Sequence, residues 1–572
     1  MTRHSAIALT TMALLASTVL AAPPAAAAEV TPDRLLNADR EPQNWLMNHR
    51  TYNGQRFSPL ARINKDNVKG LHLAYAVALG GSAGNEYTVA TPLAEDGFLY
   101  TTDAWGVLYK IDARSGDVGR IVWRMDPKQE RLQRNRGAAL WGNLVITGAG
   151  IAPPRIIATD KETGKVVWET SFPDTPDVTF TSAPLAIKDK IMVGAANGDQ
   201  GVRDWIGALD AATGKVVWRK FIIPAPGEPG SETWKDNHNA WQTGGGAVWV
   251  TGTYDPATNQ TIWGTGNPVP MFDPTYRPGD NLYTDSMISW DPDSGKMNWY
   301  FQYLPGDMWD YDEEGSHILI DGQIDGQKHT LVTHSARNGF LYTFERNSGQ
   351  PVLAKPYLDK ITWTKGIDQK TGKPVDYDPG KSVQSYSGMQ NQTLADPTKK
   401  LCPSMNGGNN FWPSAYSPKT KLIYIPASTS CNELTFNPAL SNKADGWKGA
   451  TFRHIERNES DLIAADPLTG EIKKKVHLPY QNESGALATN GGLVFTAFLD
   501  GTVAAYDDTT LEQLWRFNAG VGFMAPPMTF EVNGKQYLAI TSGPSPTSRT
   551  KLLATPELND QRSATVLYVF SL

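Results

Sequence analysis

The chain has 572 residues, with 53 Lys and Arg against 59 Asp and Glu, which gives a formal net charge of −6 at pH 7. A mildly acidic protein is poorly suited to nucleic acid, so no nucleic-acid partner is expected, whereas a basic protein partner is compatible with this charge. The two cysteines form no Cys-x-x-Cys-His motif, which excludes a c-type haem attached to this polypeptide.

The N-terminus has the composition of a secretory signal. Arg3 and His4 precede an apolar run over 6–20 and a series of small residues, so we expect a signal peptide over 1–28 and export to the periplasm. The apolar run is too short for a membrane span, and none is expected later. The mature chain, 29–572, is expected to form one domain with no fused cytochrome. Because the chain is exported, Cys402 and Cys431 are expected to pair in a disulfide.

A spaced pattern of Asp, Gly and Trp recurs along the chain. It occurs at Asp160, Gly164 and Trp168, and the same spacing returns in 210–218 and 291–299. Each copy lies between two short alternating apolar runs, which is typical of two strands joined by a turn that contains Gly. Looser copies begin at four further positions, which are Asp112, Glu345, Asp466 and Asp507.

The distance between copies predicts the fold. Asp112 to Asp160 is 48 residues and Asp160 to Asp210 is 50, which suits one four-stranded propeller blade per copy, with inserted loops where the gaps are longer. Seven copies and an early strand region near 71–79 predict an all-β, eight-bladed β-propeller. A solenoid or a propeller that only binds other molecules would contain similar turns.

The densest acidic segment with aromatic neighbours is 306–314. In an extended segment Asp310 and Asp312 point the same way, so two carboxylates would converge and would suit a hard metal ion or an acid/base site. An acidic surface loop is the alternative. Other single residues have two readings as well: Asn267 and Asp199 as ligands or turn residues, Arg136 and Arg337 as carboxylate binders or surface residues, and Trp249 as a stacking surface or core.

Several segments together resemble the pyrroloquinoline quinone (PQQ)-dependent alcohol dehydrogenases of the methanol/ethanol dehydrogenase family. The resemblance runs from about residue 44 to 572, and the repeat is similar to the family's tryptophan-docking motif, in which the Trp of each blade packs on the next. Its more specific motifs are Gly244–Trp249, Gly264–Pro268, Arg277–Asn281, Trp309–Asp312 and Val569–Leu572.

The resemblance implies roles for individual residues. Asp310 would take the proton of the alcohol, and Arg337 would lie next to the reacting quinone oxygens. Trp249 would form the floor under PQQ. The remaining implied contacts are Arg136, Thr181 and Asn410 to the polar edge of the quinone, and Asn267, Asp199 and Asp310 to the metal ion.

Asp312 bears on the identity of the metal. Calcium-dependent members of the family usually have a small uncharged residue two places after the catalytic Asp, whereas lanthanide-dependent members have a second Asp there. One more carboxylate neutralises a trivalent ion better, so Asp312 predicts a lanthanide as the cofactor metal, with Ca²⁺ as the alternative.

The chain also departs from the family pattern. Glu130 and Arg131 stand where adjacent cysteines are usual, and Asp199 replaces a Glu that binds the metal. Val89 replaces a Glu that contacts the cofactor. Ala196 stands where a hydroxyl is common, and Glu483 occupies a usually uncharged or aromatic region.

The predicted function is oxidation of a primary alcohol to an aldehyde, with electrons passed to a separate cytochrome c or a similar acceptor; a homodimer is compatible with this prediction. One alternative is a calcium-dependent quinoprotein that acts on another alcohol, a polyol or an aldehyde. Another is a non-catalytic propeller scaffold of the cell envelope. Such a scaffold needs the blade tryptophans but has no need of Trp249, Asn267, Asp310 and Arg337 together.

Overall fold

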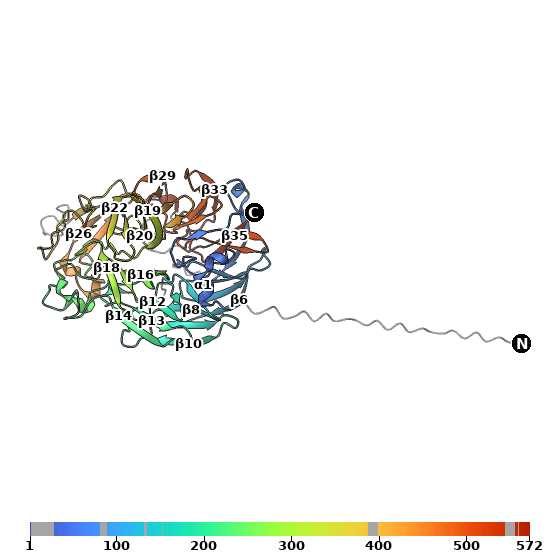
Figure 1. The fold of residues 1–572 in the computed structure, drawn as a ribbon, viewed down its shortest axis with the longest axis horizontal. Coiled ribbons are helices and arrows are strands. Elements are labelled where there is room, and N and C mark those ends of the chain that lie inside the picture. The colour runs from blue at the N-terminus through green and yellow to red at the C-terminus, as the bar shows by residue number, and fades with distance from the viewer. Residues whose placement is uncertain are drawn as a thin grey trace.

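The computed structural model describes Met1 and residues 28–80, 88–130, 134–150, 153–386, 398–543, 555–558 and 560–572. The predicted signal peptide therefore lies almost wholly outside the described residues. Strands dominate the described chain (Figure 1), and the helices are short. They are α1 (Pro32–Leu36), η1 (Ala38–Arg40), η2 (Val68–Gly70), η3 (Gly198–Gln200), η4 (Ser231–Thr233), η5 (Ala240–Thr243), η6 (Pro438–Leu440), η7 (Lys443–Asp445) and η8 (Pro556–Leu558).

The first five sheets in chain order are antiparallel and have four strands each, and strands adjacent in sequence are adjacent in the sheet. Their strands are β3 (Leu93–Glu95), β4 (Phe98–Thr102), β5 (Leu108–Asp112), β6 (Arg120–Met125); β7 (Ala138–Trp141), β8 (Leu144–Ala149), β9 (Arg155–Asp160), β10 (Val166–Ser171); β11 (Leu185–Ile187), β12 (Lys190–Gly194), β13 (Trp205–Asp210), β14 (Val216–Phe221); β15 (Thr253–Asp255), β16 (Gln260–Gly264), β17 (Ser286–Trp290), β18 (Met297–Gln302); and β19 (Ile318–Ile324), β20 (Gln327–Ser335), β21 (Phe340–Glu345), β22 (Pro351–Pro356).

The later sheets are less regular. The sixth contains β24 (Ala415–Ser417), β25 (Leu422–Ser428), β28 (Ser460–Ala465) and β29 (Ile472–Leu478). A separate three-stranded sheet is formed by β23 (Thr398–Leu401), which precedes β24, and by β26 (Asn432–Phe436) and β27 (Ala450–His454), which are inserted between β25 and β28. Cys402 and Cys431 join beside this inserted sheet, which confirms the predicted disulfide.

Two segments from the N-terminal part complete the last two sheets. β1 (Phe57–Ser58) pairs in parallel with β30 (Ala486–Thr489) of the sheet that continues through β31 (Leu493–Ala497), β32 (Thr502–Asp507) and β33 (Gln513–Asn518). β2 (His72–Ala78) pairs antiparallel with β36 (Val566–Ser571), next to β35 (Lys535–Thr541) and β34 (Met528–Val532). An early strand and the last strand of the chain thus share one sheet, and in Figure 1 blue and red segments lie side by side there.

The repeated Asp and Gly form the turn between the third and fourth strands of a sheet. Asp160 ends β9, and its Oδ1 accepts hydrogen bonds from the amide and the hydroxyl of Thr163 at 2.7 Å each. Gly164 follows with φ +72°, a conformation that Gly adopts without steric cost. The turn is therefore encoded locally by these residue types.

The repeated Trp reaches the turn of the following sheet. Trp168 Nε1 donates to the carbonyl of Ala211 at 3.2 Å, and Trp218 Nε1 donates to the carbonyl of Pro292 at 2.8 Å. A Cβ placed on Gly295 would lie 2.5 Å from the Trp218 indole, so only Gly leaves room for the ring. These contacts connect successive sheets of the propeller.

The predicted site residues all lie at one end of the sheets. Each is in a loop that precedes a first strand or joins a second strand to a third, and antiparallel strands bring these loops to the same face. The Asp and Gly turns lie at the opposite end. Among the described residues, no helix is long and apolar enough to cross a membrane.

Candidate active site

The acidic segment 306–314 is buried along its whole length, so the alternative of an acidic surface loop is wrong. Asp310 and Asp312 both face the guanidinium of Arg337, which lies in the loop between β20 and β21. Arg337 Nη2 lies 2.8 Å from Asp312 Oδ2, and Nη1 lies 3.6 Å from Asp310 Oδ2. Two carboxylates and one cation thus meet at one point, beside a backbone that is strained at Asp310, where φ is 64°.

Asp312 connects three of the predicted site residues. Its Oδ2 accepts a hydrogen bond from Trp249 Nε1 at 3.1 Å as well as the ion pair from Arg337. Its Oδ1 accepts a hydrogen bond from the backbone amide of Asn267 at 2.5 Å. Asp312 therefore fixes the positions of the aromatic floor, the Asn267 turn and the arginine relative to one another.

The carboxylates influence one another electrostatically. Burial, with smaller contributions from the like charges of Asp312 and Asp199, raises the pKa of Asp310 well above its usual range, although Arg337 opposes the shift. Burial raises the pKa of Asp199 to about 6, the like charge of Asp312 adds to this, and Arg337 opposes it. Asp199 lies in η3, and its side chain keeps contact with solvent although protein surrounds it. A cation placed among these groups would relieve their repulsion.

Trp249 forms a flat surface on which cationic groups lie. The guanidinium carbon of Arg136 is 4.5 Å from the Trp249 ring centroid, and that of Arg337 is 5.9 Å away. The Phe411 ring packs beside Trp249 with centroids 6.2 Å apart. The backbone amide of Trp249 donates to Glu314 Oε2 at 2.8 Å, and this hydrogen bond fixes the backbone of the aromatic residue.

Thr181 and Asn410 lie at the edge of this surface. The Thr181 carbonyl accepts hydrogen bonds from the Arg136 amide at 3.1 Å and from its Nη1 at 3.3 Å. The buried Thr181 hydroxyl has no hydrogen-bond partner among the described residues. Asn410 instead folds onto its own loop: Nδ2 donates to the carbonyl of Asn406 at 2.9 Å and Oδ1 accepts from the Phe411 amide at 2.7 Å.

These features fit a planar anionic cofactor. Trp249 offers a flat aromatic face, Arg136 and Arg337 offer positive charge beside it, and the unsatisfied hydroxyl of Thr181 offers a polar contact. Within the described ranges, no three His, Cys, Asp or Glu side chains converge as a preformed metal cluster. The coupled carboxylates of Asp199, Asp310 and Asp312 supply the donor type and the charge that a hard cation requires.

The departures from the family pattern have different surroundings. Val89 is buried in an apolar cluster with Ala104, Leu499 and Met524, against which Phe411 packs. Ala196 is buried and its backbone pairs with Thr179. Glu130 is exposed, Glu483 is fully buried, and Arg131 lies outside the described residues.

Sequence reasoning missed the carboxylates that support the site. Glu313 Oε2 accepts from the Arg337 amide and from His334 Nε2, both at 3.0 Å, and Glu314 supports Trp249 as described above. The period-two argument applied to Asp310 and Asp312 would have reached Glu314 as well.

Comparisons with known proteins agree with this geometry. The family model described as PQQ, glucose/ethanol/alcohol dehydrogenase, β-propeller domain, matches residues 45–355 and 461–538. The quinohemoprotein alcohol dehydrogenase ADH IIB of Pseudomonas putida is 35% identical over 529 residues, which cover 87% of this chain and 73% of that protein. The quinoprotein alcohol dehydrogenase PedH of Pseudomonas putida is 32% identical, covering 95% of this chain and 93% of the other.

A solved structure is similar throughout. The europium-containing methanol dehydrogenase superposes with a TM-score of 0.84 and 28% identity, covering 94% of this chain and 100% of that one. The resemblance predicted from the sequence motifs, and the β-propeller fold with it, are confirmed. The chain is an oxidoreductase that belongs to the family of PQQ-dependent quinoprotein alcohol dehydrogenases.

Proposed function

We propose that this protein is an exported dehydrogenase that oxidises primary alcohols to aldehydes with PQQ and a lanthanide ion, and that a separate cytochrome c or similar acceptor takes the electrons. The observation that carries the proposal is the convergence of Asp310 and Asp312 on Arg337 at the edge of Trp249. The apolar run before Ala28 supports export to the periplasm.

We also infer that the propeller has eight blades docked by tryptophan. The eight four-stranded sheets among the described residues, one of them extended by β1, support the number. The hydrogen bonds from Trp168, Trp218 and Trp515 to carbonyls of the following sheet support the docking role.

The protein's own residues would prepare the substrate. Asp310 is the base that accepts the hydroxyl proton of the alcohol, and the adjacent Arg337 guanidinium stabilises its carboxylate form. The apolar cluster that contains Val89 and packs against Phe411 would exclude water beside Trp249. Bound PQQ supplies the two-electron acceptor, and a bound metal ion supplies a Lewis acid that activates it.

Asp199, Asn267, Asp310 and Asp312 would hold the metal ion. Asp312 brings the formal charge of the three carboxylates to −3 when ionised; Arg337 offsets part of it, and the extra carboxylate favours a trivalent lanthanide over Ca²⁺. This charge count is the physical support for a lanthanide. The shorter Asp199 reaches less far than a Glu would, and its exposure to solvent leaves room for a water between it and the ion.

The proposal is tested with purified protein, PQQ and an artificial electron acceptor, with LaCl₃ or CaCl₂ added separately, against short primary alcohols, a polyol and an aldehyde. Alcohol-dependent dye reduction with La³⁺ alone is the expected result. Activity with Ca²⁺ alone would retain the dehydrogenase and reject the lanthanide. Failure to bind PQQ with either metal would reject the enzyme in favour of a scaffold.

A further inference from the structure

Asp204 is a buried carboxylate that the proposed mechanism does not use. It lies directly before β13 and has no exposed surface. Among the described residues, neither of its carboxylate oxygens accepts a hydrogen bond of normal geometry, and the backbone amide of Gly198 is a donor that faces the carboxylate. Burying an ionised carboxylate without a cationic partner costs several kcal/mol, and a cation bound nearby would lower that cost.

Its position joins two loops that carry predicted metal ligands. A Cβ placed on Gly198 would lie 3.2 Å from Asp204 Oδ2, so the carboxylate lies against the η3 turn next to Asp199. The Asp204 amide donates to the carbonyl of Gly245 at 3.1 Å, and the neighbouring Gly246 amide donates to the carbonyl of Asn267 at 3.2 Å. Asp204 thus lies behind the turns of Asp199 and Asn267.

Among the described residues, no cationic side chain contributes to the shift in the pKa of Asp204. Burial and the like charge of Asp199 raise the pKa of Asp204 well above its usual range, and the Gly198 amide opposes them. Asp199 in turn experiences the charge of Asp312. Asp204 is therefore coupled electrostatically to Asp199, and Asp199 to Asp312, while the cations Arg134 and Arg337 act on Asp199. Arg337 also pairs with Asp312.

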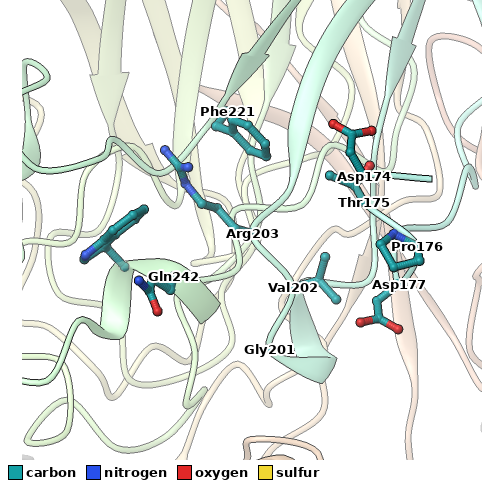
Figure 2. A pocket seen from close by; sticks show the side chains of 10 residues that line it. Asp174, Thr175, Pro176, Asp177, Gly201, Val202, Arg203, Phe221 and Gln242 are labelled. Atoms are coloured by element: carbon teal, nitrogen blue, oxygen red, sulfur yellow. The ribbon is translucent and has the colours of Figure 1, made fainter. Parts of the chain in front are cut away.

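The outer side of the same loop is a separate feature. Gly201, Val202 and Arg203 leave η3 along a cavity of about 350 Å³ (Figure 2), and Asp204 is not part of its lining. Arg203 is already engaged there: its guanidinium lies 4.2 Å from the Phe221 ring centroid and donates twice to the carbonyl of Ile223. The Asp204 carboxylate is fully buried and does not line this cavity, so the cavity is not part of the surroundings considered for Asp204.

We propose that Asp204 is a positioning residue of the metal site, which holds the Asp199 turn against the Asn267 turn and adds negative charge behind the short Asp199 side chain. The inference rests on the proposed metal-dependent function. A bound cation, attracted by Asp199 and Asp204 together, would lower the cost of burying the Asp204 carboxylate. A trivalent ion gains more from the extra charge than a divalent ion, because the Coulomb energy scales with the product of the charges.

The test is calorimetric titration of the full-length protein with LaCl₃ and with CaCl₂ in the presence of PQQ. Asp204→Asn should weaken La³⁺ binding by about 10- to 100-fold, as is typical when a group behind a metal ligand is lost, and Ca²⁺ binding by a smaller factor. The matched control is Asp508→Asn, which changes a buried carboxylate paired with Lys65, away from the site, and should leave both affinities unchanged.

Thermal unfolding gives a second readout. Metal-free Asp204→Asn should melt at a higher temperature than the wild type, because the free-energy cost of burying the Asp204 carboxyl group is removed, and it should gain less from added La³⁺. Equal loss of La³⁺ and Ca²⁺ affinity, or wild-type affinity for both, would overturn the role of Asp204 while leaving the proposed function intact. If the wild type itself binds neither metal, the proposed function fails together with this inference.

Discussion

The contact between Trp218 and Gly295 makes a specific prediction about how the sheets are held together. Gly295 has φ +68° and is buried under the Trp218 indole, whose Nε1 bonds to the Pro292 carbonyl. Gly520 has φ +70°, is exposed, and would have no atom within 4 Å of an added Cβ. Ala at the two positions therefore meets the same backbone strain, and only Gly295→Ala displaces a tryptophan.

The magnitudes follow from this difference. Ala in a left-handed conformation costs about 1–2 kcal/mol. Ala also lowers the conformational entropy of the unfolded chain, which stabilises the protein by about 0.4–1 kcal/mol, so Gly520→Ala should destabilise it by about 1 kcal/mol in total. Gly295→Ala should cost about 3 kcal/mol more, from overpacking of about 1–3 kcal/mol and the loss of one hydrogen bond worth about 1 kcal/mol. For a chain of 572 residues, 3 kcal/mol corresponds to a Tm about 2–3 °C lower.

Both variants would be compared by urea unfolding, followed by tryptophan fluorescence, and by calorimetry. In a Trp218→Leu background the extra cost of Gly295→Ala should fall toward that of Gly520→Ala, since the displaced ring is gone. Equal destabilisation by the two single variants in the wild-type background would refute the idea that the indole requires Gly at this turn.

Three further predictions concern the site and stability. Asp312→Ala removes a carboxylate that pairs with Arg337 at 2.8 Å, so bound lanthanide measured by mass spectrometry should fall at least roughly tenfold; unchanged binding and turnover would contradict the metal assignment. Burial, with Arg56 nearby, lowers the pKa of His49 to about 4, so the unfolded chain binds the proton more strongly and stability is lost as pH falls from about 6.5 to 4. His49→Gln should reduce that loss by about 3 kcal/mol in denaturant titrations at both pH values, and an unaltered pH profile would argue against it. Replacing Cys402 and Cys431 by Ser should lower the free energy of unfolding by about 3.5 kcal/mol through the 29-residue loop, and reductant should then have no further effect.

The repeating parts of the fold could be predicted because their causes are local. Asp160 accepts a hydrogen bond within its own turn and Gly164 supplies the left-handed residue, so the turn can be predicted from a few adjacent residues. The signal weakens where another residue takes the role: in the copy that begins at Asp507, Leu511 occupies the position of Gly with φ 55°. Within the candidate site, Trp249, Asn267, Asp310 and Asp312 lie in the family motifs, and the other site residues were assigned from the wider family resemblance.

Other features depend on contacts that are distant in sequence. The inserted sheet β23, β26 and β27 has no counterpart in the repeat, so nothing in the spacing predicts it. The placement of Arg136 over Trp249 joins residues more than a hundred positions apart. Asp204 belongs to no motif in the sequence. It becomes a candidate only because the fold buries its carboxylate without a hydrogen bond of normal geometry from the described residues.

The pairing of β2 with β36 has a consequence for how the protein is made. Because His72 lies opposite Ser571, the ring has no closing seam until the ribosome has added the last residues of the chain. Every nascent or truncated chain exposes two unpaired strand edges, at β2 and at β35, which are templates for association with other chains. Loss of β36 would therefore cause aggregation out of proportion to the few residues removed, because the edges of β2 and β35 that face it would stay unpaired.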